Sequence, residues 1–345
     1  RAVEDSGLGR VHDKILKNRR KTLGTLRDVL KGKSVGVIRD DPDTGITEIA
    51  KPIGVVAAVV PSTNPAATPA NKTMMALKSR NAVILAPSPK GASTCQLLIR
   101  YIHAELDKVG APRDLVQGLL QPSKELTYEL MRQCDLVVVT GSQKNVRAAY
   151  SSGTPAIGVG IGNAAVIIDR SADLADAAEK IKRSKTFDYA TSCSSENSLH
   201  IDAAVYDDAL KELEGQGGYL LDGSQKARLQ KVMWPNGTLS PNVIGQPPAV
   251  IAKLAGLDDG AAHEAAFFMV EEDGVGPEHP FSGEKLSIVL AVYRFDDLDK
   301  ALQRIEQIYE YQGAGHSCGI HTRNPEHAER VAHRLRVARV LVNQA

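Results

Sequence analysis

Cys193 is the residue of this sequence best suited to act as a nucleophile. It lies in SKTFDYATSCSSEN at 184–197, among small and hydroxyl-bearing residues, between an amphipathic run at 174–184 and the strand-like LHIDAAVY. An ordinary thiol has a pKa of about 8.5, so it needs a helix N-terminus, a cation or donors in a dry pocket to react well at neutral pH. Because most cysteines are small buried packing residues, the segment alone supports either role.

Asn64 follows the first predicted buried strand, in the loop PSTNPAAT. An asparagine between a strand and a helix commonly forms the turn or caps the helix. The alternative is an amide donor directed at an oxyanion, the charge that develops when a nucleophile attacks a carbonyl group. The residues by themselves leave both interpretations open.

Two further strand ends carry residues suited to a nucleotide. Ser88 and Lys90 lie in APSPKG, where their side chains are candidates to bind a ribose or a phosphate. The alternative for Lys90 is a loop lysine that contacts only solvent. Gly141 and Ser142 begin a predicted helix in VVVTGSQKNVRAAY, and a helix start offers N–H groups to an anion. The pattern is neither GxGxxG nor a P-loop, so alone it is weak evidence for nucleotide binding.

His316, in GAGHSCG, is the best candidate to deprotonate an incoming thiol or to tune Cys193, because imidazole titrates near neutral pH. The alternative is a structural histidine in a loop that enters a strand. The remaining cysteines are predicted to be packing residues: Cys95, Cys134 and Cys318. Three other histidines recur at a spacing of six without a ligand pattern, so no metal site is predicted from them: His321, His327 and His333.

Composition narrows the class of protein. The 42 lysines and arginines nearly balance the 41 aspartates and glutamates, which predicts no general attraction to nucleic acid or to an anionic membrane. The four cysteines have no CxxC spacing, which favours a reducing, cytoplasmic location. No run of 18 apolar residues is present, and the N-terminus has no signal-peptide pattern. The chain opens within a predicted helix and stops after VARVLVNQA, so we expect the natural protein to extend beyond both ends.

Strand-like and helix-like segments alternate along most of the chain, which predicts parallel, doubly wound sheets. Residues 1–31 read as helical, and 34–51 as a hairpin around the turn DPDTG. Strands are predicted at 54–61, 81–86, 115–119, 136–140 and 164–169, with helices at 69–78, 93–109, 123–132 and 144–151. A second α/β unit is predicted after Cys193, with strands at 198–206, 242–244, 265–270, 287–292, 317–321 and 340–343. The tract at 215–218 and the segment 271–283 are predicted to be loops.

Taken together, these segments resemble the aldehyde dehydrogenase superfamily, and specifically its CoA-acylating branch. The likeness covers nearly the whole chain and is most specific in AAYSSGTPAIGVGIGN, SKTFDYATSCSSEN and GHSCGIHT. These resemble acylating acetaldehyde, succinate-semialdehyde and sulfoacetaldehyde dehydrogenases. The resemblance implies two doubly wound α/β domains with a hairpin oligomerisation arm: a dinucleotide-binding domain at 1–33 and 52–170, the arm at 34–51, and a catalytic domain at 171–345.

The resemblance also implies roles for the residues in these motifs. Cys193 matches the nucleophile, Asn64 the oxyanion donor, and Glu284, in SGEKLS, a ribose-binding glutamate. Gly141 and Ser142 match the turn at the pyrophosphate of the cofactor, which is NAD or NADP. The resemblance further implies coenzyme A as co-substrate, a short, anionic aldehyde as substrate, and a homodimer or homotetramer as the assembly.

Gly158 decides the reaction type that the resemblance implies. Hydrolytic members carry a glutamate in an ELGGK-like motif that activates water, whereas AIGVGIGN places Gly158 at about that position. Without a base, water attack on an acyl enzyme is slow, and a thiol such as coenzyme A is the expected acyl acceptor. The alternatives are a hydrolytic aldehyde dehydrogenase that forms a free acid, and a structural or assembly module, which the intact Cys193, Asn64 and Glu284 set argues against.

Overall fold

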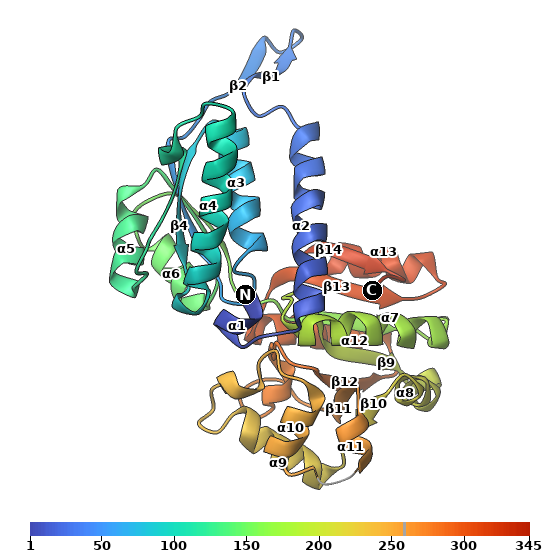
Figure 1. Ribbon diagram of the computed structural model, residues 1–345. Helices are drawn as coiled ribbons and strands as arrows, with labels where there is room; N and C mark the ends of the chain where they lie inside the picture. The colour runs from blue at the N-terminus through green and yellow to red at the C-terminus, as the bar shows by residue number, and fades with distance from the viewer. Residues whose placement is uncertain (258–259) are drawn as a thin grey trace. The chain divides into compact units, whose positions relative to one another are not determined.

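The computed structural model describes residues 1–257 and 260–345, and the chain divides into two compact units, Arg1–Gly160 and Ile161–Ala345. Each unit contains its own parallel β-sheet with flanking helices (Figure 1). This is the α/β class that the alternation of strands and helices predicted.

The first unit is built on a five-stranded parallel sheet in the order β5-β4-β3-β6-β7. Its strands are β3 (Val55–Val60), β4 (Ala82–Pro87), β5 (Val116–Gly118), β6 (Leu136–Thr140) and β7 (Ala156–Val159). Its helices after the hairpin are α3 (Ala67–Lys78), α4 (Ala92–Lys108), α5 (Lys124–Gln133) and α6 (Gln143–Tyr150). Strand β7 was not predicted, because the glycines of AIGVGIGN interrupt its apolar pattern.

Strand β3 shows why this sheet is covered on both faces. Val56, Ala58 and Val60 belong to one apolar cluster, with residues of α3 and α4. Ala57 and Val59 belong to a second cluster, with residues of α5 and α6. Successive side chains of a strand point to opposite faces, so a run of small apolar residues with no polar position specifies a buried central strand.

The N-terminal segment is helical, as predicted. It forms α1 (Ala2–Ser6) and α2 (Val11–Lys31), because Gly7 adopts a left-handed conformation, with φ of 69°, that ends α1. The predicted hairpin is confirmed: β1 (Gly36–Asp41) and β2 (Ile46–Ala50) pair in antiparallel fashion. Its side chains are largely exposed, including the apolar Val37 and Ile49.

The second unit is built on a seven-stranded parallel sheet in the order β10-β11-β12-β9-β8-β13-β14. Its strands are β8 (Ala164–Ile168), β9 (Glu196–Asp202), β10 (Gly218–Leu220), β11 (Phe267–Glu271), β12 (Val289–Phe295), β13 (Gly315–His321) and β14 (Val337–Val342). Its helices are α7 (Leu174–Thr186), α8 (Tyr206–Gly215), α9 (Gly223–Met233), α10 (Pro248–Leu254), α11 (Gly260–Glu264), α12 (Leu298–Tyr311) and α13 (Pro325–Arg334). One large apolar cluster forms the core of this unit.

Two predictions in the second unit were wrong. The predicted strand at 242–244 is a 3-10 turn at Pro241–Val243, where the Ser240 side chain caps the turn and Pro241 lacks the N–H that a strand ladder needs. The predicted loop at 215–218 is only partly a loop, because β10 begins at Gly218 and pairs with β11.

The boundary between the compact units also differs from the predicted domain boundary at 170/171. Strand β8 was placed in the dinucleotide-binding domain, but it pairs with β9 and β13 in the sheet of the second unit. The boundary at Gly160/Ile161 therefore precedes β8. Hydrogen bonding between strands decides which sheet β8 joins, and its apolar sequence fits the centre of either sheet.

Candidate active site

The segment that carries Cys193 is held in an unusual backbone conformation. After α7 ends, Asp188, Tyr189 and Ala190 have consecutive positive φ values of 54°, 48° and 58°. Residues with a Cβ atom avoid this region at a cost of roughly 1 kcal/mol or more each. The turn is held by buried Asp188, which accepts hydrogen bonds from the side chain and the backbone N–H of Thr191. Cys193 follows this turn, half-buried, just before β9.

His316 lies against Cys193, although 122 residues separate them in the chain. Its Nε2 atom is 3.1 Å from the Cys193 Sγ atom, and its Nδ1 atom is 2.8 Å from the hydroxyl oxygen of Ser317. Ser317 is buried, and the Tyr309 hydroxyl donates to its carbonyl oxygen at 3.1 Å. A nucleophile, a base within hydrogen-bond reach and a third group that orients the base form a nucleophilic constellation.

Gly162 makes this close approach possible. A Cβ atom at position 162 would lie 2.6 Å from the carbonyl oxygen of Cys193 and 2.9 Å from the Cδ2 atom of His316. Only glycine fits there without displacing the pair. Gly162, Cys193 and His316 lie near the starts of β8, β9 and β13, which are neighbours in the sheet. The candidate site is therefore at the amino end of this parallel sheet.

Glu284 belongs to the same region of the second unit. Its Oε1 atom accepts a hydrogen bond of 3.0 Å from the Gly162 N–H, and its own N–H donates to the Gln312 side chain at 2.7 Å. Burial raises the pKa of Glu284 to about 7. A carboxyl group with such a pKa carries a proton part of the time at neutral pH.

Two buried lysines accompany Glu284. The Lys185 ammonium donates to the carbonyl oxygen of Glu196 at 2.6 Å, and burial lowers the pKa of Lys185 to about 7. The Lys285 side chain donates to the carbonyl oxygens of Phe281 and Gly283, and burial lowers its pKa well below the usual value. Perturbed titrating groups gather at functional sites, so these residues mark the same region as the cysteine. Neither lysine is predicted from the sequence, and neither are Gly162 and Ser317, because each acts through packing or through a partner that is distant in sequence.

A pocket of about 360 Å³ lies in the first unit. It is lined by the carboxyl ends of β3, β4 and β6 and by the N-terminal turns of α5 and α6. The strand order places it where the chain switches direction in the sheet, which is the usual ligand crevice of doubly wound folds. It therefore has the position and size of a nucleotide site.

The predicted nucleotide-binding residues of the first unit fall in or beside this pocket. Ser88, Gly141 and Ser142 line it, and the Ser142 side chain caps α6 by accepting from the Asn145 N–H. Lys90 is exposed and lies outside the lining, next to the lining residue Pro89. Glu284, predicted for the same ligand, belongs to the second unit.

Asn64 lies in the loop between β3 and α3 of the first unit. Its amide nitrogen makes one long hydrogen bond, 3.5 Å, to the Thr63 hydroxyl. Its amide oxygen is buried and has no hydrogen-bond partner among the described residues. Its backbone carbonyl accepts from the Thr68 N–H, but its side chain caps no helix.

Gly158 lies in β7, where packing explains the glycine. A Cβ atom would lie 2.8 Å from Cγ1 of Val146 and 3.0 Å from Cε2 of Tyr150. The Gly158 N–H donates to the Tyr150 hydroxyl at 3.0 Å. Close contact with α6, and not a positive φ, requires glycine here.

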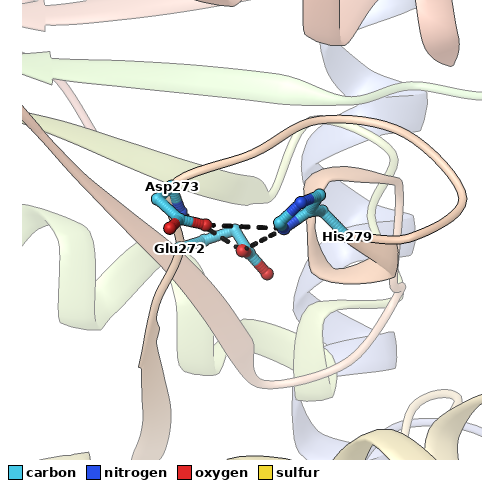
Figure 2. A group of neighbouring side chains, drawn as sticks. All are labelled: Glu272, Asp273 and His279. Carbon is cyan, nitrogen blue, oxygen red and sulfur yellow. Dashed lines mark hydrogen bonds and ion pairs between the residues drawn. The ribbon is translucent and has the colours of Figure 1, made fainter.

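Glu272, Asp273 and His279 form a cluster with the chemistry of a metal site at the end of β11 (Figure 2). His279 Nδ1 lies 2.7 Å from a Glu272 carboxylate oxygen and 3.5 Å from an Asp273 oxygen. The Lys226 ammonium lies 3.3 Å from the other Glu272 oxygen, so a cation already compensates the buried carboxylate. We interpret the cluster as an ion-pair network that closes the loop after β11.

Within the described part of the chain, no helix combines the length and the apolar character needed to cross a bilayer.

The comparisons with known proteins agree with one another, because each match given below is to an aldehyde dehydrogenase. The family model "Aldehyde dehydrogenase family" matches residues 12–218. A sulfoacetaldehyde dehydrogenase (acylating) of Cupriavidus necator is 60% identical over 346 residues, covering 100% of this chain and 70% of the relative. An acetylating aldehyde dehydrogenase structure from Geobacillus thermoglucosidasius is 37% identical with a TM-score of 0.93, over 100% of this chain and 76% of that one. A Rhodopseudomonas palustris propionaldehyde dehydrogenase structure with bound propionyl-CoA is 26% identical with a TM-score of 0.85, over 99% of this chain and 75% of that one.

Proposed function

This chain belongs to the aldehyde dehydrogenase family, and we propose that it oxidises a short aldehyde to acyl-CoA, with NAD or NADP as oxidant and a Cys193 thioester as intermediate. The observation that carries this proposal is the contact of 3.1 Å between Cys193 Sγ and His316 Nε2. Sulfoacetaldehyde and succinate semialdehyde are the proposed substrates, the first because the 60% identical relative is named for it. NAD(P)H formation and acyl-CoA analysis, with and without coenzyme A, test this function.

The proposed reaction has two stages. His316 accepts the proton of the Cys193 thiol, and the thiolate forms a C–S bond to the aldehyde carbon. A bound nicotinamide dinucleotide would supply the hydride acceptor for this oxidation, and Cys193 would then carry the acyl group as a thioester. The thiol of coenzyme A then attacks the thioester carbon, the bond to Cys193 breaks, and acyl-CoA leaves. One aldehyde, one coenzyme A and one NAD(P)⁺ give one acyl-CoA, one NAD(P)H and one proton.

The pocket of the first unit fits a nicotinamide dinucleotide. Its place at the sheet switch point and its hydroxyl-rich lining suit a ligand with ribose and phosphate groups. We assign Gly141 and Ser142, at the start of α6, to the pyrophosphate, because helix N-termini favour anions. Ser88 and Lys90 are assigned to the adenosine side and Glu284 to a ribose.

We expect His316→Ala to lower turnover by roughly 10²- to 10⁴-fold, which is the usual contribution of a general base. The physical reason is that the Cys193 thiol loses its nearest proton acceptor. Alkylation of Cys193 by iodoacetamide at pH 7 should slow in parallel, which mass spectrometry of the modified peptide measures. The matched control is His333→Ala, which removes an exposed imidazole from α13 and should change neither quantity. An unchanged rate of Cys193 alkylation in His316→Ala would show that His316 is not the base.

We expect Asn64→Ala to lower turnover by roughly 10²-fold, the loss expected for one oxyanion donor. The long bond to Thr63 leaves the amide N–H groups available for a ligand. Steady-state kinetics measure turnover, and calorimetric titration with the nicotinamide cofactor measures its affinity, which should change little. A weaker cofactor affinity with unchanged turnover would make Asn64 a turn residue.

We propose that the protein forms a homodimer or homotetramer through the hairpin arm. The arm exposes apolar side chains on both strands, and a two-stranded hairpin is marginal on its own. We also propose a cytoplasmic location, because none of the four cysteines forms a disulfide in the described residues.

A further inference from the structure

Gly162 depends on its neighbours to hold its backbone in place, because a glycine has unusual conformational freedom. Its Cα atom must nevertheless stay in close contact with Cys193 and His316. Its N–H group donates to the Glu284 Oε1 atom at 3.0 Å. Its carbonyl oxygen accepts a hydrogen bond of 3.3 Å from the Nδ2 atom of Asn197. Both polar groups of Gly162 are therefore held by side chains that are distant in sequence.

Asn197 also holds the turn that carries the nucleophile. Its side chain is 3% exposed, near the start of β9. The Nδ2 atom of Asn197 donates to the carbonyl oxygen of Ser195 at 3.3 Å. The Ser195 N–H in turn donates to the carbonyl oxygen of Ser192 at 2.9 Å, and Cys193 lies inside the turn that this bond closes. One amide group therefore connects the turn of the nucleophile to Gly162.

The contacts of Asn197 belong to a closed ring of hydrogen bonds. Asn197 donates to Gly162, and Gly162 donates to Glu284. The next residue, Lys285, returns to Asn197, because its backbone N–H donates to the Oδ1 atom at 3.0 Å. A side-chain amide offers both donors and an acceptor, so one asparagine closes the ring from both sides. A buried network of this kind makes the surrounding structure rigid.

We propose that Asn197 is a positioning residue for the proposed reaction. It holds Gly162 and the Cys193 turn so that the Cys193 thiol stays within hydrogen-bond reach of the His316 imidazole. The inference rests on the proposed function, since it concerns the nucleophile of the same reaction. It goes further by naming a residue that acts on the Cys193–His316 pair through Gly162 and Ser195.

The pH profile of Cys193 alkylation by iodoacetamide, followed by mass spectrometry of the modified peptide, tests this role. We expect Asn197→Ala to lower the alkylation rate at pH 7 by about tenfold and to move the midpoint of the profile toward about 8.5, the pKa of an ordinary thiol. The reason is that the thiol moves away from the imidazole that accepts its proton. Turnover should fall roughly 10²-fold, as for a displacement of about 1 Å. Asn197→Asp keeps the oxygen that accepts from Lys285 but lacks the N–H donor, so its profile should shift in the same direction.

Asn81→Ala is the matched control. Asn81 is a buried asparagine of the first unit, and its Oδ1 atom accepts hydrogen bonds from the N–H groups of Ile53 and Gly54. Its loss should lower the melting temperature, as loss of the Asn197 amide does, because both variants leave buried backbone groups without a partner. It should leave the alkylation profile of Cys193 unchanged. Circular dichroism identifies the variants that fold.

Gly162→Ala, alone and combined with Asn197→Ala, completes a double-mutant cycle. The added Cβ atom displaces the Cys193–His316 pair directly, so the double variant should be alkylated no more slowly than the slower single variant. Independent, multiplicative losses of rate, or an unchanged profile in either folded Asn197 variant, would overturn the positioning role. Absence of coenzyme-A-dependent aldehyde oxidation in the unmodified protein would overturn the proposed function instead. Alkylation needs neither aldehyde nor cofactor, so the two failures are distinguished.

Discussion

Replacing Cys193 with alanine is expected to abolish both aldehyde oxidation and acyl transfer to coenzyme A. Both stages of the proposed reaction form or break a bond to Sγ, so no partial route remains. The expected loss is roughly 10⁴-fold or more in turnover, as for other removed nucleophiles. The side chain is half-buried in the segment just before β9, so a methyl group should be tolerated and the fold retained. NAD(P)H absorbance measures the activity, and circular dichroism measures the fold.

Cys318→Ala is the matched control. Cys318 is fully buried in β13, and burial raises the pKa of its thiol to about 12, which makes it a poor nucleophile. Loss of its sulfur should cost about 1 kcal/mol of stability through a small cavity and change activity little. More than a trace of turnover in Cys193→Ala would place the nucleophile elsewhere.

Without coenzyme A, we expect NAD(P)H formation to stop after about one equivalent per active site. Cys193 is then held as a thioester, and its release requires an acyl acceptor. Position 158, which the family resemblance aligns with the water-activating carboxylate of hydrolytic members, is glycine and packs against α6. Stopped-flow absorbance gives the amplitude of the burst, and mass spectrometry of the quenched protein gives the acyl adduct on Cys193.

Adding coenzyme A should restore steady turnover, and Cys193→Ala should give no burst. Gly158→Glu is a poor test of the missing base, because its side chain would meet Val146 and Tyr150 at less than normal contact distance. The burst in the unmodified protein is therefore the decisive measurement. Steady formation of free acid without coenzyme A would overturn the acylating reaction and favour a hydrolytic one.

The sequence determined the fold class, the hairpin and the positions of most strands. The alternation of apolar strands and amphipathic helices is a local pattern, and a parallel α/β sheet follows from it directly. Prediction from the sequence failed where the local pattern was ambiguous. The glycines of β7 interrupt the apolar pattern of a strand, and the apolar residues at 242–244 suggested a strand where a proline-containing 3-10 turn lies. Strand β8 was also assigned to the wrong unit, because an apolar run does not reveal which sheet supplies its hydrogen-bonding partners.

The candidate active site was likewise only partly predictable from the sequence. Residue type and motif likeness pointed to Cys193, His316 and Glu284 before any geometry was known. Only the tertiary structure decided that His316 contacts the thiol, that Ser317 contacts the imidazole, and that Gly162 leaves room for both. These facts depend on strands far apart in sequence that become neighbours in one sheet, and on a strained turn at 188–190 that no local propensity predicts. The perturbed pKa values of Lys185 and Glu284 arise for the same reason, since burial is a property of the folded chain.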